Sequence, residues 1–267
     1  MGFFAWLFKK NKKTKKITVG LALGSGGAKG FAELGALKAF EEAGIKFDMI
    51  SGASIGSIIG AFYADGYSVT DIGEMIAKIN PSEIVNPLLM GMDMGGLQKV
   101  IDRELGEKNI EELKLPFIAV ATEIESGEDR AFTTGNTALA LCASASIPPF
   151  FKPVYIDGVR YVDGAYSNSV PADHLRKRGA DYIVGIDLST RESKASLLSK
   201  IFPIYQPKEQ SPWQKGYDNA DVMLHPDLTG YKSTSFKYSA RMFEIGYHHA
   251  KEFIPKIKED LARLQGK

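Results

Sequence analysis

Ser54 lies between two glycines, in the segment Gly52-Ala53-Ser54-Ile55-Gly56. The segment matches the pattern G-x-S-x-G, in which a nucleophilic serine occupies a sharp turn between a strand and a helix. The flanks fit this pattern, because the apolar residues 47–51 predict a strand and a helix follows that ends near Gly66. Glycines remove side chains that would clash in the turn, and the N-terminus of the helix favours negative charge that develops at the serine. The context therefore favours a nucleophile over a structural turn of small residues.

A second glycine-rich segment, GSGGAKG at 24–30, also joins a predicted strand to a predicted helix. A dinucleotide-binding G-x-G-x-x-G starting at Gly24 would need glycine where Lys29 stands, and a P-loop would need Ser or Thr where Gly30 stands. A third interpretation is an oxyanion hole, in which bare backbone N–H groups face the anionic oxygen of a tetrahedral intermediate. The alternative is a tight strand–helix connection without chemistry.

The residues alone do not identify the base that would activate Ser54. A Ser–His–Asp triad needs a histidine, usually late in the chain. The histidines are His174 in a charged helix, His225 before Pro226, and the adjacent pair His248 and His249 on the C-terminal helix. None is flanked like a catalytic histidine, and His174 is expected in solvent. Asp163, in the turn Asp163-Gly164-Ala165, is the other candidate, although an aspartate in such a turn is often only a turn former.

Four segments in a fixed order resemble the patatin-like phospholipases. They are GSGGAKG at 24–30, GASIG at 52–56, SASIPPFFKPV at 144–154 and DGAYSNSVPA at 163–172. GADYIVGIDL at 179–188 and HPDLTGYKST at 225–234 are also similar to the small bacterial members. The resemblance runs from about residue 17 to about residue 250. It implies an α/β fold, a three-layer sandwich with a mostly parallel central sheet, for residues 17–267.

The resemblance also implies a chemistry, hydrolysis of a lipid ester or small ester through an acyl-enzyme. Carried over by motif, Ser54 is the nucleophile and Asp163 is the base, so no histidine, metal or cofactor is needed. The two side chains are then expected within hydrogen-bond reach of each other. The oxyanion hole would consist of the amides of Gly26 and Gly27 with the adjoining Ala28. The positions that support these motifs are Gly24, Lys29, Gly30, Gly52, Gly56 and Gly164.

Two positions depart from the family's usual pattern. The first glycine of its loop motif falls on Ser25, with Gly24 beside it, and Glu33 stands where many bacterial members carry histidine. Three other interpretations stay open beside the leading one. They are an α/β-hydrolase that uses His225, His248 or His249, a catalytically silent lipid-binding protein and a dinucleotide-binding protein. Intact Ser54 and Asp163 argue against the second, and Lys29 against the third.

The elements that must position these residues can be predicted from periodicity. Strand–loop–helix units occur twice, at 17–43 and 47–66, and favour a parallel sheet with crossover helices. Further strands are predicted at 116–124, 159–164, 182–188 and 220–226, with a hairpin partner at 131–135. Further helices are predicted at 67–79, 97–105, 137–147, 171–178 and 235–264. Residues 80–96 and 189–217 do not fit regular structure. We expect the Met-rich part, 88–96, and the segment 189–217 to border the mouth of the site and bind acyl chain.

Charge separates a short tail from the body. Residues 1–16 contain six lysines, no acidic residue and the apolar run FFAWLF, whereas the remaining chain carries 27 basic and 32 acidic residues, a net of −5. The tail is expected to contact an anionic membrane surface, and the body is not a nucleic-acid binder by charge. The single cysteine, Cys142, excludes an intrachain disulfide and fits a reducing compartment. No apolar run reaches the roughly 18 residues that span a bilayer. We expect a cytoplasmic protein, peripheral to the inner face of the membrane.

Overall fold

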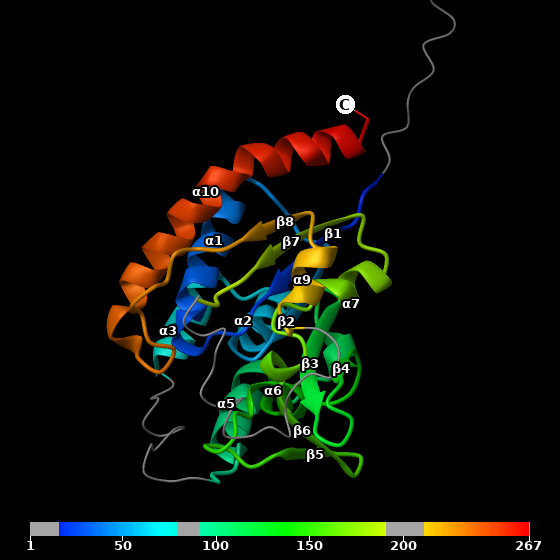
Figure 1. Ribbon diagram of the computed structural model, residues 1–267, viewed down its shortest axis with the longest axis vertical. Helices are drawn as coiled ribbons and strands as arrows, with labels where there is room; N and C mark the ends of the chain where they lie inside the picture. Colours follow the sequence, from blue (N-terminus) through cyan, green and yellow to red (C-terminus); the bar gives the residue numbers. More distant parts are fainter. Residues whose placement is uncertain (1–15, 79–90, 191–210, 267) are drawn as a thin grey trace, which may run out of the picture.

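A central β-sheet with helices on both faces forms the protein (Figure 1). The computed structural model describes residues 16–78, 91–190 and 211–266. The strands in these ranges are β1 (Val19–Leu23), β2 (Met49–Ala53), β3 (Phe117–Glu123), β4 (Asp129–Phe132), β5 (Val154–Ile156), β6 (Val159–Asp163), β7 (Tyr182–Ile186) and β8 (Val222–Leu224). The α-helices are α1 (Phe31–Glu42), α2 (Ile55–Ala64), α3 (Val69–Lys78), α5 (Gly95–Leu105), α6 (Thr137–Ala145), α7 (Ala172–Lys177), α9 (Gln214–Asn219) and α10 (Ser239–Leu264).

The sheet has the order β5-β6-β3-β2-β1-β7-β8, with β4 paired to β3 off this path. The strands from β3 to β8 along this order pair in parallel, while β4, β5 and β6 pair antiparallel at one end. Every residue of β1 and of β7 is buried. Both faces of these strands are covered, which explains their continuous apolar sequences.

The side chains of the central strands alternate between two hydrophobic clusters. Leu21 and Leu23 of β1 pack into the larger cluster, together with buried residues of α1, α2 and α6. Ala22 packs on the opposite face with Ala172 and Leu175 of α7. Helices therefore form the outer layers of a three-layer sandwich, as the sequence predicts.

Most predicted elements are present, with boundaries shifted by a few residues. The segment 189–217, expected to lack regular structure, contains the start of α9 at Gln214, which corrects the prediction. Its sequence QKGYDN holds poor helix formers, so local propensity does not reveal this helix. Tertiary packing forms it, since a Cβ on Gly216 would lie only 2.7 Å from the Val170 carbonyl oxygen. The short edge strand β5 was not predicted either.

Parts of the predicted loops and tail lie outside the described residues, namely 1–15, 79–90 and 191–210. In the part of the chain that the structure does describe, no helix is both long enough and apolar enough to cross a membrane.

Candidate active site

Ser54 occupies a strained turn between β2 and α2. Its backbone angles are φ 54° and ψ −127°, in a region that side chains rarely adopt. A Cβ on Gly52 would lie 2.3 Å from the Gly56 carbonyl oxygen, and one on Gly56 would lie 2.6 Å from the carbonyl oxygen of Gly24. Both glycines are thus required by close packing, and the turn holds Ser54 in its elbow conformation.

The Ser54 hydroxyl donates a hydrogen bond to Asp163 Oδ2 at 2.5 Å. The two residues are 109 positions apart in the chain. They meet because Ser54 follows β2 and Asp163 ends β6, and both strands pair with β3 between them. Both side chains are almost completely buried, at 5% and 1% exposure. The structure thus brings together the two residues that the motifs single out.

Burial sets the ionisation of Asp163. Removing the carboxyl from water raises its pKa to about 6, although hydrogen bonds from Ser54 and from the Ala165 amide lower it. The Ala165 N–H donates to Asp163 Oδ1 at 2.8 Å and holds the carboxylate in place. Asp163 can therefore accept and release a proton near neutral pH, a property more often supplied by histidine.

Two hydroxyl groups connect this pair to β3, and sequence reasoning missed both. Ser144 Oγ, on α6, accepts the Ser54 amide at 3.0 Å and donates to the Val120 carbonyl oxygen at 2.6 Å. Thr122 Oγ1 donates to the Asp163 carbonyl oxygen at 2.8 Å. Both hydroxyl groups are buried. The one sequence signal that could have identified them is a hydroxyl residue in a mostly apolar segment.

The glycine loop 24–30 lies beside the N-terminus of α2. A Cβ on Gly30 would lie 2.6 Å from Ile55 Cγ1, so the loop packs against the residue after Ser54. Within the described residues, the amides of Gly26 and Gly27 have no hydrogen-bond acceptor. Lys29 is buried at the end of the loop, where its own amide donates to the Gly26 carbonyl oxygen at 3.2 Å.

The Ala28 amide, predicted as a third donor of the oxyanion hole, already has an acceptor in the structure. Its amide donates to the Ser233 carbonyl oxygen at 2.7 Å. Gly27 adopts a positive φ of 56°, and a Cβ there would lie 2.4 Å from the same oxygen. The segment before α10 thus packs against the loop, and its Ser233 carbonyl oxygen accepts the Ala28 amide.

None of the four histidines contacts Ser54. His225 bonds to Tyr217 and to the Ser189 carbonyl oxygen, His249 Nε2 accepts the His225 amide, and His248 pairs with Glu244 on the surface. The geometry gives no support to a histidine-dependent triad.

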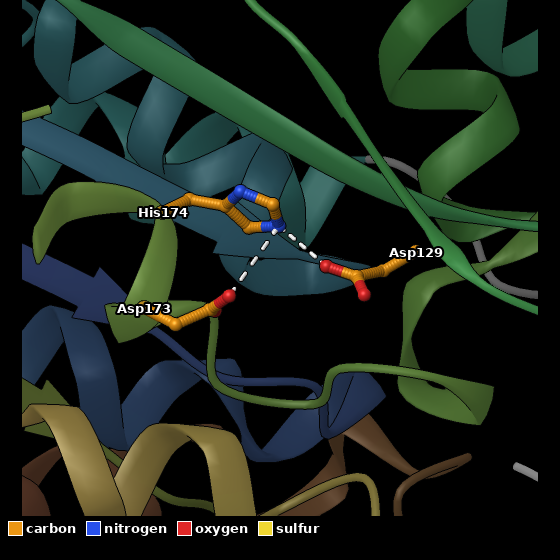
Figure 2. A group of neighbouring side chains, drawn as sticks. All are labelled: Asp129, Asp173 and His174. Carbon is orange, nitrogen blue, oxygen red and sulfur yellow. Dashed lines mark hydrogen bonds and ion pairs between the residues drawn. The ribbon is translucent and has the colours of Figure 1, made fainter. Parts of the chain in front are cut away.

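His174 is not in solvent as expected, but belongs to a polar cluster beneath the Asp163 turn. Figure 2 shows Asp129 and Asp173 converging on its ring, where His174 Nε2 contacts Asp129 Oδ2 and lies 3.9 Å from Asp173 Oδ2. Such a group of ligand types can hold a metal ion. Here Lys215 contacts Asp129, and Lys177 lies 2.8 Å from Asp173. The lysines balance the two carboxylates, so a cation would have to displace them.

Asn168 joins this cluster to the Asp163 turn. Its side-chain Nδ2 donates to Asp173 Oδ1 at 2.7 Å and to Asp129 Oδ2 at 3.1 Å. Its backbone N–H donates to the Gly164 carbonyl oxygen at 2.9 Å. Burial would raise the pKa of Asp129, but hydrogen bonds from His174, Lys215 and Asn168 outweigh it and hold the pKa well below its ordinary value. The cluster is a charged support for the turn that carries Asp163.

A cavity of about 610 Å³ lies between α5, α6 and β5. Its lining is mostly apolar and includes Met94, Leu139, Cys142, Val154 and Tyr155, with Lys152 also among the lining residues. Burial raises the pKa of the Cys142 thiol to about 12, so this thiol stays protonated and is not a nucleophile. Met94 belongs to the Met-rich segment 88–96, of which residues 91–96 are described.

Comparison with known proteins identifies the family of this chain. A family model for the patatin-like phospholipases matches residues 21–176, more than half of the chain. The chain belongs to the patatin-like phospholipase family. This confirms the family predicted from the four motifs.

Among curated relatives, patatin-like phospholipase domain-containing protein 6 of Mus musculus is 28% identical over 278 residues, covering 88% of this chain and 20% of the relative. Lysophospholipase nte1 of Aspergillus fumigatus is 27% identical over 280 residues, covering 91% of this chain and 18% of the relative. The chain therefore spans about a fifth of the length of these relatives.

Solved structures of low identity share the fold. VipD of Legionella pneumophila aligns with a TM-score of 0.61 and 15% identity, over 91% of this chain and 68% of that one. Human GIVD cytosolic phospholipase A2 aligns with a TM-score of 0.54 and 13% identity, over 94% of this chain and 60% of that one. These likenesses confirm the predicted α/β sandwich.

Proposed function

We propose that this patatin-like protein is a serine lipid acyl hydrolase in which Ser54 is the nucleophile and Asp163 is the general base. The observation that carries the proposal is the 2.5 Å hydrogen bond between these two buried side chains, with Ser54 in a strained strand–helix turn. Family membership supports the reaction class. The names of the curated relatives, a phospholipase domain protein and a lysophospholipase, favour a lipid ester as substrate.

The proposed reaction has two stages, acylation of Ser54 and hydrolysis of the acyl-enzyme. Ser54 Oγ attacks the acyl carbonyl carbon while its proton moves to Asp163 Oδ2. The carbon–oxygen bond to the alcohol then breaks, and Asp163 returns the proton to the leaving alkoxide. Water attacks the acyl-enzyme, giving a proton to Asp163, and Ser54 recovers its proton as the fatty acid leaves. A carboxyl with a pKa of about 6 can serve in each of these transfers.

The anionic oxygen of the tetrahedral intermediate is assigned to the amides of Gly26 and Gly27. Both lack an acceptor in the described part of the chain, and the loop packs against Ile55 next to the nucleophile. Ala28 is left out of this assignment because Ser233 occupies its amide. The dipole at the N-terminus of α2 adds to the stabilisation of charge at this place.

For the acyl chain we propose the apolar cavity beside Met94. Its volume lies in the range of ligand pockets. Helix α6, which contributes Leu139 and Cys142 to the lining, also carries Ser144, whose Oγ accepts the Ser54 amide. The loops 88–96 and 189–217 would border its entrance, although residues 88–90 and 191–210 lie outside the described ranges.

Residues 1–16 are proposed to hold the enzyme at an anionic membrane surface. Six lysines near such a surface each contribute about 1 kcal/mol at low salt, while the apolar residues before them enter the interface. The remaining chain carries a net charge of −5 and would be repelled by the anionic surface, so the tail would dominate binding.

The test has two parts on separate samples of wild type and Ser54→Ala: labelling with a fluorophosphonate, and incubation of unlabelled protein with a panel of phospholipids, lysophospholipids and acylglycerols read by mass spectrometry. We expect the label on Ser54, no label on the Ser54→Ala variant, and release of fatty acid by the wild-type protein alone. Hydrolysis that persists in Ser54→Ala would contradict the proposed function.

A further inference from the structure

Glu33 is a buried carboxyl group that the proposed mechanism does not use. It is the third residue of α1, directly after the glycine loop, and its side chain is fully buried, at 0% exposure. Its Oε1 accepts the Gly24 amide at 2.6 Å. Its Oε2 is buried and has no hydrogen-bond partner within the described residues. A carboxyl group held in this way destabilises the fold unless the bond to the loop compensates for it.

The bond from Glu33 closes the glycine loop at its first residue. The other anchors of the loop use backbone carbonyl oxygens, since Ser25 donates to Ser169 and Ala28 donates to Ser233. Gly24 packs closely against the end of β7, since a Cβ on it would lie 2.5 Å from the Ile186 carbonyl oxygen. The start of the loop is therefore fixed on one side by β7 and on the other by the Glu33 side chain.

The surroundings favour the neutral form of Glu33. Burial raises its pKa well above the ordinary range, the bond from the Gly24 amide opposes this in part, and the negative charge of Asp187 raises the pKa further. Asp187 itself accepts hydrogen bonds from Ser189 and Tyr217. A neutral carboxyl accepts the Gly24 amide through its carbonyl oxygen and adds no negative charge near the forming oxyanion. A glutamine at this position offers the same acceptor.

We propose that Glu33 is a positioning residue for the oxyanion-binding loop. By accepting the Gly24 amide it fixes the start of the loop, so that the amides of Gly26 and Gly27 face the oxygen that becomes negative in the transition state. Because such donors act only as charge develops, a misplaced loop lowers kcat and leaves KM nearly unchanged. This inference rests on the function proposed above.

Two substitutions distinguish the effect of the hydrogen-bond acceptor of Glu33 from the effect of its side-chain volume. Glu33→Gln keeps the oxygen that bonds to Gly24, and we expect its kcat within about threefold of the wild type. Glu33→Leu removes the acceptor but fills the space, and we expect kcat to fall by about tenfold or more with KM within about threefold, bounded by the 10²–10³ that loss of a whole donor costs. Glu41→Leu, an exposed carboxylate of the same helix, is the matched control and should keep the wild-type kcat.

The measurement is kcat and KM on a soluble ester, with the thermal midpoint of each variant recorded beside it. An unchanged kcat in a folded Glu33→Leu variant would overturn the inference, as would a loss in KM alone or a loss of more than tenfold in Glu33→Gln. If Glu33→Leu does not fold, Glu33→Asp replaces it. The shorter side chain of aspartate cannot reach the Gly24 amide, but it keeps a carboxyl group at the buried position. Absence of turnover in the wild type would contradict the proposed function itself, whereas an active wild type with a fully active Glu33→Leu contradicts only the role of Glu33.

Discussion

Protonation of Asp163 should switch the enzyme off at a pH where an ordinary aspartate is still charged. With a pKa of about 6, Asp163 is charged in most molecules at pH 7 and in roughly one-tenth of them at pH 5. An aspartate at the ordinary value of 3.8 would remain more than nine-tenths charged at pH 5. We therefore expect kcat/KM to fall by about tenfold between pH 7 and pH 5.

The same shift has a consequence for stability, and its sign follows from the direction of the shift. The folded-state pKa of Asp163 lies above the unfolded value, so the folded protein binds this proton more tightly. The cost of keeping the buried charge is fully present above pH 6 and disappears as the pH falls toward 3.8. A shift of this size corresponds to about 3 kcal/mol at neutral pH. Asp163→Asn, which keeps the shape without the charge, should raise the free energy of unfolding by up to about 3 kcal/mol at pH 7.5 and by about a third as much at pH 4.5.

The assay is a pH–rate profile with a short-chain, non-ionising ester, combined with urea unfolding of wild type and Asp163→Asn at the two pH values. A soluble substrate keeps membrane binding out of the profile. An acid limb with its midpoint near pH 4, or an Asp163→Asn variant less stable than wild type at pH 7.5, would refute the argument that burial controls this carboxyl.

Four further outcomes are expected. Gly52→Ala should abolish turnover and lower the thermal midpoint, because its Cβ would lie 2.3 Å from the Gly56 carbonyl oxygen; unchanged melting and activity would remove this explanation of the elbow. Ser144→Ala leaves the Ser54 amide without its partner, and kcat on the soluble ester should fall by about tenfold; full activity would show the bond to be dispensable. Met94→Ala should alter the preference for acyl-chain length in a series of esters, and an unaltered preference would rule out the cavity as the chain site. A chain starting at Ile17 should lose salt-sensitive binding to anionic vesicles in co-sedimentation while keeping its activity on the soluble ester; equal binding by both chains would rule out the tail as an anchor.

The part of the site that the sequence predicts is the part built from neighbouring residues. The elbow around Ser54 depends on glycines two positions away and on the strand and helix that flank it, all of which appear in one short segment. Asp163 could be assigned only through the family resemblance, because its contact with Ser54 depends on β2 and β6 both pairing with β3. No periodicity of the sequence reveals that strand order.

The features that were missed depend on long-range contacts of polar groups. Ser144 and Thr122 are short hydroxyl side chains in apolar segments, and their roles arise only when the helix and the strand that carry them meet the active-site turns. The Ala28 amide was expected to be free, but the segment that occupies it comes from Ser233, far along the chain. Helix α9 forms through packing against the loop at Val170 rather than through its own propensity.

The central claim is that Ser54 and Asp163 act as one catalytic unit, and a double-mutant cycle tests it most directly. We would measure kcat/KM on a soluble ester for Ser54→Ala, Asp163→Asn and the double variant, with folding checked by circular dichroism. Each single substitution should lower kcat/KM by about 10³-fold or more, and the double variant should be no worse than either single variant, since removing one member already disables the other. Losses that multiply in the double variant, or an Asp163→Asn enzyme that keeps more than about a tenth of the wild-type activity, would contradict the dyad.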